Sequence, residues 1–202
     1  PKAKRSSYDK VLIVCEGEKT EPNYFNECIQ FYKINTANVE VDGTCGSSPK
    51  SVYERAIELW ETEEKNGDPY DRVYCVFDRD THETYDKTVR RISERNPRDI
   101  FYAAVSVPCF EYWLLLHFKY TARRPYATTG KLSVGGEVLR ELKKVMPDYE
   151  KGNNNIFLSL SSKIEFAKGN AAISLKHAKD NRTDNPSTSI HDLVDYLQNL
   201  KS

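Results

Sequence analysis

Every side chain in residues 11–15 (VLIVC) is apolar, and residues 71–78 (DRVYCVFD) contain a second, nearly continuous apolar run. A strand with one face in water alternates apolar and polar residues, whereas a strand covered on both faces is apolar throughout. The two runs therefore predict strands that are buried on both faces. Strands of this kind belong to parallel sheets that carry helices on either side.

Helical patterns and further strands alternate with these runs as far as residue 118. The spacing predicts helices over 21–33, 47–67 and 83–95, strands over 37–43 and 99–107, and a helical block over 109–118. Thr20 is the expected N-cap of the first helix, and Ser48 with Pro49 is expected to begin the second. Strand and helix in regular succession favour a three-layer α/β fold, in which a parallel sheet is flanked by helices, over residues 8–118.

The pattern changes after Phe118. Residues 119–133 are basic and rich in turn formers, and helices are expected at 134–146, 160–180 and 188–200, with no strand of comparable strength. Residues 1–118 carry 16 Lys and Arg against 21 Asp and Glu, a net charge of −5, and residues 119–202 carry 14 against 9, a net charge of +5. We expect 119–202 to be a helical, basic C-terminal region packed on the α/β domain. The division of charge between the two parts suits an acidic site beside a basic surface that binds a polyanion.

Cysteine usage and hydropathy narrow the class of protein. The five cysteines are odd in number, have no C-x-x-C spacing and have no His close behind them, which argues against a zinc module and a disulfide framework. No apolar run approaches the length that spans a bilayer, and the basic start of the chain lacks a signal-peptide pattern. These features predict a soluble protein of a reducing, cytoplasmic compartment, without a membrane partner.

Carboxylates follow two of the predicted strands. Glu16, Glu18 and Glu21 come directly after the first strand, and Asp78 and Asp80 come at the end of the third. Because ligands of open α/β sheets bind outside the carboxyl ends of the strands, neighbouring strands would bring these groups together. A D-x-D alone is more often a turn or a cap, so the argument depends on the pair of motifs. Crowded oxygen ligands favour Mg²⁺ or Mn²⁺ and phosphoryl-transfer chemistry.

Further candidates lie outside the two acidic segments. Glu111 is expected in the first turn of the helix after the fourth strand, either as another metal ligand or as a partner of the helix dipole. Lys19 and Arg79 are candidate phosphate contacts. Lys168 and Lys176 belong either to a stripe that binds nucleic acid or to a solvated helix face. In the segment from Asn185 to Thr188, the hydroxyl of Ser187 or Thr188 is the expected N-cap of the last helix, and an anion site at that helix N-terminus is the alternative. His117 is expected to pack or to form a hydrogen bond, and contact with substrate is the alternative.

The motifs resemble known families. V-C-E-G-E-K-T-E after the first strand and F-D-R-D after the third are similar to the two signature motifs of the Toprim domain, which occurs in topoisomerases, primases and nucleases of the overcoming-lysogenization-defect (OLD) type. The opening E-G-E-K-T-E-P-N-Y-F, the block P-C-F-E-Y-W-L-L-L-H-F and the late N-P-S-T together resemble RloB-like proteins. That resemblance implies a Toprim- or Rossmann-like fold, a place in bacterial phage-defence loci and an ABC- or AAA-type ATPase partner.

The resemblance also implies roles for individual residues. Glu16 corresponds to the Toprim glutamate, a metal ligand and general acid or base, and Asp78 and Asp80 correspond to the metal-binding aspartates. Glu21 lies near the second acidic position of OLD-type nucleases. We expect Glu21 and Glu18 to lie next to the metal ligands rather than to bind the metal directly. The leading hypothesis is a nuclease that depends on Mg²⁺ or Mn²⁺ and cuts DNA or RNA, with Glu16 and Lys19 as catalytic residues. A non-catalytic regulatory or binding subunit of an ATPase complex, or a nucleotidyl- or phosphotransfer enzyme, are the alternatives.

Overall fold

The sheet contains five strands. The computed structural model describes residues 8–120, 125–128, 130 and 132–200. Its strands are β1 (Val11–Cys15), β2 (Val39–Asp42), β3 (Arg72–Asp78), β4 (Phe101–Val107) and β5 (Ser187–Thr188). They lie in the order β2-β1-β3-β4-β5, and the first four are parallel, whereas β5 runs antiparallel to β4. The carboxyl ends of β1, β3 and β4 therefore meet at one edge of the sheet.

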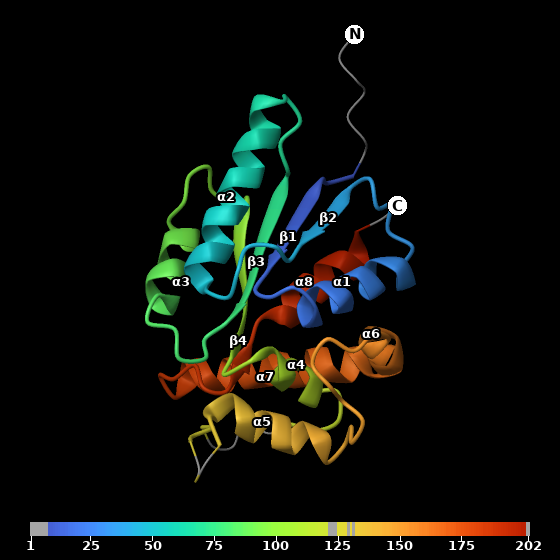
Figure 1. The fold of residues 1–202 in the computed structure, drawn as a ribbon, viewed down its shortest axis with the longest axis vertical. Coiled ribbons are helices and arrows are strands. Elements are labelled where there is room, and N and C mark those ends of the chain that lie inside the picture. The colour runs from blue at the N-terminus through green and yellow to red at the C-terminus, as the bar shows by residue number, and fades with distance from the viewer. Residues whose placement is uncertain (1–7, 121–124, 129, 131, 201–202) are drawn as a thin grey trace.

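Helices cover both faces of the sheet. α2 (Pro49–Lys65) and α3 (Tyr85–Ser93) pack on one face, and α1 (Thr20–Phe31) and α8 (Ile190–Asn199) pack on the other (Figure 1). Along β1, Val11, Ile13 and Cys15 belong to the hydrophobic cluster under α1 and α8, and the residues between them belong to the cluster under α2 and α3. The two clusters confirm the predicted three-layer α/β fold, and both faces of β1 are fully buried.

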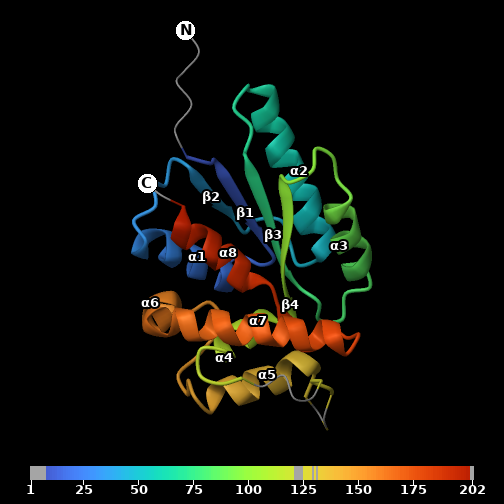
Figure 2. The same cartoon turned by 180° about the vertical axis from the view of Figure 1, so that it is seen from behind.

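A further group of helices lies below the carboxyl edge of the sheet (Figures 1 and 2). It consists of α4 (Phe110–Leu115), α5 (Val134–Lys143), α6 (Ile156–Leu160), the 3₁₀ turn Ser161–Lys163 and α7 (Ile164–Asp180). The apolar side chains of α4 are fully buried and share one cluster with α1, α7 and α8. Residues from both parts of the chain thus build the same core. Within the described residues, none of the helices has the length and apolar character needed to cross a membrane.

The N-cap predicted from the sequence is confirmed for α2 but not for α1. Ser48 caps α2 with Ser51 in a reciprocal capping box, and Pro49 is the first helical residue, as predicted. The expectation that Thr20 caps α1 was wrong, because Thr20 is already helical and Lys19 occupies the N-cap position. The hydroxyl of Thr20 instead accepts a hydrogen bond from the backbone N–H of Gly152, a residue of the C-terminal region.

The segment at 185–189 also differs from the expectation. Ser187 and Thr188 form β5, and Ser189 rather than either of them occupies the N-cap position of α8, although the Thr188 hydroxyl still accepts a hydrogen bond from the N–H of Ile190 at 3.2 Å. The Ser189 hydroxyl accepts a hydrogen bond at 2.9 Å from the N–H of Val105, and its own N–H donates to the Val105 carbonyl at 2.9 Å. Pairing with the edge of β4 satisfies more backbone groups than a cap would, so the polar segment becomes a short strand.

Candidate functional site

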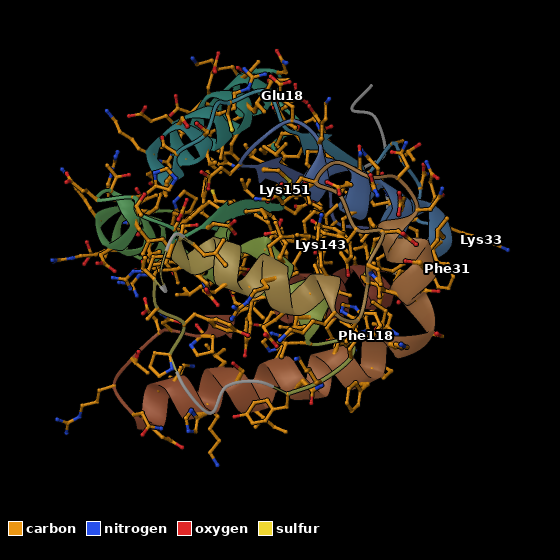
Figure 3. All side chains as sticks on the ribbon, turned by 60° about the horizontal axis from the view of Figure 1, so that its bottom comes forward. Glu18, Phe31, Lys33, Phe118, Lys143 and Lys151 are labelled. Atoms are coloured by element: carbon orange, nitrogen blue, oxygen red, sulfur yellow. The ribbon has the colours of Figure 1, made fainter. Side chains whose placement is uncertain are left out.

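The predicted acidic residues line one cavity at the carboxyl edge of the sheet. Its volume is about 500 Å³. In Figure 3, which brings this side of the molecule forward, the labels of Glu18 and Lys151 mark segments from the N-terminal and C-terminal parts of the chain. The cavity is lined by Glu16, Gly17, Glu18, Lys19, Thr20, Glu21, Asp78, Asp80, His82, Glu111, Lys151 and Gly152.

A direct contact joins the two acidic motifs. Because β1 and β3 are neighbours and Cys15 lies opposite Val76, the residues after both strands emerge side by side. Glu16 Oε2 accepts a hydrogen bond from the N–H of Asp78 at 3.0 Å, and Glu16 Oε1 lies 3.0 Å from His82 Nε2. The carboxylate of Glu16 is therefore held between the third strand and the loop that follows it.

Electrostatic crowding changes the protonation of this cluster. Burial raises the pKa of Asp78 well above its usual range, and the neighbouring charges of Glu21 and Glu111 raise it further. Burial also raises the pKa of Glu21 to about 7, and Glu111 and Glu16 act in the same direction. Carboxylates that repel one another in this way are stabilised by a shared proton or by a cation.

Glu111 lies in the first turn of α4, as the sequence predicts, and its side chain is only 3 % exposed. It accepts a hydrogen bond from the hydroxyl of Tyr149 at 3.1 Å, and Lys151 Nζ lies 3.3 Å from the same Oε1 atom. Two residues of the C-terminal region therefore neutralise and orient this carboxylate. The side chain of Lys151 is 66 % exposed, so its charge also faces the cavity.

The loop that carries Lys151 is fixed to α1. The N–H of Gly152 donates to Thr20 Oγ1 at 3.0 Å, and Asn23 Nδ2 donates to the Gly152 carbonyl at 3.1 Å. Farther along, the carboxylate of Glu27 accepts hydrogen bonds from the N–H groups of Asn155 and Phe157. α1 thereby fixes the position of Lys151, which is distant from it in the sequence.

Asp80 and Glu18 line the same cavity but are exposed. The N–H of Asp80 donates to the carbonyl of Pro108 at 3.0 Å, which joins the loop after β3 to the loop after β4. Asp80 has a positive φ of 34°, a backbone conformation that aspartate adopts more readily than most residues. The structure thus brings together Glu16, Glu18, Lys19, Glu21, Asp78, Asp80 and Glu111.

Comparison with known proteins identifies the family of the chain. The sequence matches the RloB-like protein family over residues 11–197, nearly its whole length. The chain belongs to the RloB-like family. No curated protein matches it. The matched range contains every residue that lines the cavity.

Three basic residues that the sequence singled out lie outside the cavity of this RloB-like protein. Arg79 forms an ion pair with Asp184, lies 3.4 Å from Asp86 and stacks over the ring of Tyr85. Lys168, only 17 % exposed, pairs with Asp195 at 2.5 Å and with Glu165 at 3.3 Å. Lys176 is exposed on α7. A role for these residues in binding nucleic acid stays a prediction.

Sequence reasoning missed four residues of the site, namely His82, Tyr149, Lys151 and Gly152. His82 follows Asp80 by two positions, and this proximity to a predicted metal ligand was a usable signal. The other three belong to a polar loop around the KGNNN segment, and nothing in its spacing indicates that it reaches the sheet edge. Only the docking of this loop on α1 places them there.

The donor chemistry of the RloB-like cavity suits a hard divalent cation, since carboxylate oxygens predominate. Within the residues that the structure describes, however, no three His, Cys, Asp or Glu side chains are placed to hold one metal ion in their present positions. Glu16 is engaged by His82, and Glu111 by Tyr149 and Lys151. A metal would therefore bind only if one of these carboxylates turned away from its present partner.

Proposed function

We propose that this RloB-like protein is a divalent-metal-dependent nuclease that hydrolyses phosphodiester bonds of DNA or RNA. The observation that carries the proposal is the joining of six carboxylates, which follow three separate strands, together with two lysines in one open cavity. Following the resemblance described above, we extend the proposal to anti-phage defence in the bacterial cytoplasm, in concert with an ATPase partner. The Toprim-like, OLD-type character of the domain belongs to this proposal.

Each charged group has a task in the proposed reaction. Glu16, Asp78, Asp80 and Glu111 would hold Mg²⁺ or Mn²⁺, which when bound polarises the phosphate and acidifies water. Glu16 Oε1, now beside His82, would accept the proton of the attacking water. Lys19 and Lys151 face the cavity and would bind the non-bridging oxygens of the phosphate, where negative charge develops.

Two contacts of the carboxylates in the present structure oppose the binding of metal and substrate. Lys151 now compensates the charge of the buried Glu111, so a phosphate that attracts Lys151 would leave Glu111 free to bind a cation. His82 holds Glu16 in a similar way. Metal and phosphate would therefore bind cooperatively, each weakening a contact that opposes the other.

A cleavage assay tests the proposal. Purified protein is incubated with labelled DNA and RNA in Mn²⁺, in Mg²⁺ or in EDTA, alone and with the proposed ATPase partner. The expected result is metal-dependent cleavage that falls about a hundredfold or more in an Asp78→Asn/Asp80→Asn variant. Glu64→Gln is the matched control, because Glu64 is an exposed acid near the far end of α2 that does not line the cavity.

Equal products from the wild type and the double variant, with the ATPase present, would refute the nuclease. One observation favours the alternative of a non-catalytic regulatory subunit, namely that no three acidic or histidine ligands converge in the described part of the chain. That alternative predicts that the wild type and the double variant both bind the ATPase and that neither cleaves nucleic acid. Consumption of a nucleoside triphosphate by this protein alone, without the ATPase and without cleavage of nucleic acid, would indicate nucleotidyl or phosphoryl transfer instead.

A further inference from the structure

The outer edge of β4 is only partly covered. Of the strands that the structure describes, β5 alone pairs with this edge, at Ser106 and Val107. Ser189 then covers Val105. Figure 2 shows the remainder of β4 between α8 and α3, with no further strand beside it in the described part of the chain. Four residues of edge strand, 101–104, thus remain without a strand partner on that side, a length of about 13 Å.

Strand geometry identifies the backbone groups at this edge. The carbonyl of Ile100 accepts a hydrogen bond from the N–H of Val73, and that of Ser106 accepts one from the N–H of Arg79. The even-numbered residues of β4 therefore point their backbone groups at β3. Phe101 and Ala103 point theirs outwards. The Ala103 carbonyl accepts a 3.3 Å hydrogen bond from the Ser189 hydroxyl. The N–H groups of Phe101 and Ala103 and the carbonyl of Phe101 are left for a further strand.

Two hollows of equal size flank the same edge. Each has a volume of about 310 Å³, one on the α3 face and one on the α8 face, and Tyr102 and Ala103 line both. Successive side chains of a strand point to opposite faces of a sheet. A strand added beside β4 would therefore place alternate side chains in the two hollows, which is the arrangement by which sheet edges recognise extended peptides.

The chemistry of the hollows differs. Arg95, Arg98 and Asp99 line the hollow on the α3 face, which leaves one positive charge in excess. Arg98 is exposed, whereas Arg95 lies over the ring of Phe101 and 3.5 Å from Glu61, with its Nε atom buried without a hydrogen-bond partner in the described structure. The opposite hollow is lined mainly by Tyr74, Tyr102, Leu193 and Tyr196, with the guanidinium of Arg72 stacked on two of these rings. The first hollow suits a carboxylate, and the second suits an apolar side chain.

We propose that the edge of β4 docks an extended segment of a partner protein, in which acidic residues alternate with apolar ones. The added strand hydrogen-bonds to Phe101 and Ala103, its acidic side chains contact Arg95 and Arg98, and its apolar side chains enter the tyrosine-lined hollow. This surface shares no residue with the acidic cavity, so binding here is separable from the proposed nuclease activity.

The test uses a fluorescein-labelled peptide, Ser-Glu-Leu-Glu-Leu-Glu-Ser with blocked ends, and the complete chain. We expect saturable binding, with amide NMR shifts and slowed hydrogen exchange at Phe101 and Ala103. Arg98→Glu should weaken binding about tenfold, the loss expected for one charge-assisted hydrogen bond. Ala103→Pro removes an outward N–H at a position where an edge strand tolerates proline, and should abolish binding.

Lys87→Glu is the matched control, because it makes the same charge reversal at an exposed site on α3 outside both hollows. Its affinity should equal that of the wild type, as should its melting temperature. Equal binding of a peptide with lysines in place of the glutamates would overturn the proposal. It would also be overturned by concentration-dependent dimerisation that blocks the edge, or by an RNA oligonucleotide that binds there while the peptide does not.

Discussion

Gly152 stands where the loop from the C-terminal region passes closest to the first acidic segment. It has a positive φ of 82°, and a Cβ atom at this position would lie 3.1 Å from Cβ and 3.2 Å from Cδ of Lys19. Any other residue would therefore be strained in its backbone and would press on a side chain of the cavity. The same small residue allows its N–H to reach Thr20.

Gly152→Ala should lower the free energy of unfolding by about 1–2 kcal/mol, because alanine disfavours positive φ and the added methyl displaces Lys19. Urea denaturation measures the change. Gly169→Ala is the control, since a Cβ at that position of α7 meets open space and should stabilise the helix by about 0.5–1 kcal/mol. An equal decrease in the free energy of unfolding in both variants would show that the close approach of Gly152 to Lys19 does not affect stability.

His117 is buried behind α4 and has one satisfied ring nitrogen. Nδ1 lies 3.1 Å from the carbonyl oxygen of Trp113 and 3.2 Å from that of Leu114, so we assign the proton to Nδ1. Burial and, to a smaller extent, the charge of Lys163 lower the pKa of His117 to about 4, even though the two backbone carbonyls favour the protonated form. This histidine packs in the core rather than lining the cavity.

The lowered pKa of His117 predicts a pH dependence of stability. The unfolded chain takes up a proton near pH 6.5, whereas the folded chain does so only near pH 4, so stability falls as pH decreases between these values. The loss is at most about 3 kcal/mol. Replacing His117 by Phe should make the change in unfolding free energy between pH 7 and pH 4.5 less unfavourable than in the wild type, as measured by urea unfolding. The variant is compared with the wild type because Glu21, whose pKa is raised to about 7, acts in the opposite direction in both proteins. His177→Phe, at an exposed site, should show the same change as the wild type.

At the scale of elements, α1 acts as the platform for the loop that carries Lys151. Asn23 holds the Gly152 carbonyl, and Glu27 accepts the N–H groups of Asn155 and Phe157 at the start of α6. Glu27 is 9 % exposed, so these two bonds are shielded from water. A single glutamate thereby satisfies donors that the N-terminus of α6 would otherwise leave unpaired.

Glu27→Ala should lower the free energy of unfolding by about 2–3 kcal/mol, because two largely buried N–H groups lose their acceptor. The loop would loosen, so the proposed phosphodiesterase activity should fall as well. Asn26→Ala, an exposed neighbour on the same helix, should change neither property. Thermal unfolding and the cleavage assay measure the two effects, and an unchanged melting temperature in Glu27→Ala would contradict the role of this platform.

The elements that the sequence predicts well are those with a strong local pattern. Apolar runs identify β1 and β3, and a capping residue followed by proline identifies the start of α2. β5 and α6 were not predicted, because their formation depends on distant partners. β5 is two polar residues that pair with the edge of β4, and α6 is five residues long and is capped by Glu27.

At the scale of the whole molecule, the parallel sheet explains how much of the site was predictable. Once β1 and β3 are neighbours, the rule for strand ends brings Glu16 and Asp78 to the same edge, and the same rule places Glu111 after β4. Lys151 and Tyr149 follow no such rule. They reach the cavity through packing of the C-terminal region, which local patterns do not encode.

Metal binding should register in the stability of the whole chain. At a Mg²⁺ or Mn²⁺ concentration ten times the dissociation constant found by calorimetry, the free energy of unfolding should rise by about 1.4 kcal/mol. EDTA should reverse the gain, and Asp78→Asn/Asp80→Asn should not show it. Glu64→Gln should behave like the wild type. An equal gain in the double variant would mean that the ion binds elsewhere on the protein.

The division of the cavity between the two parts of the chain has a consequence for biosynthesis. A ribosome makes proteins from the N-terminus, and the carboxylates from Glu16 to Glu111 all precede Lys151 in the sequence. During translation the negative groups exist before their compensating lysine has been joined to the nascent polypeptide. Only when the later loop has emerged and settled on α1 does Glu111 acquire its counter-charge, so a prematurely terminated product would keep the acids and lack their balance.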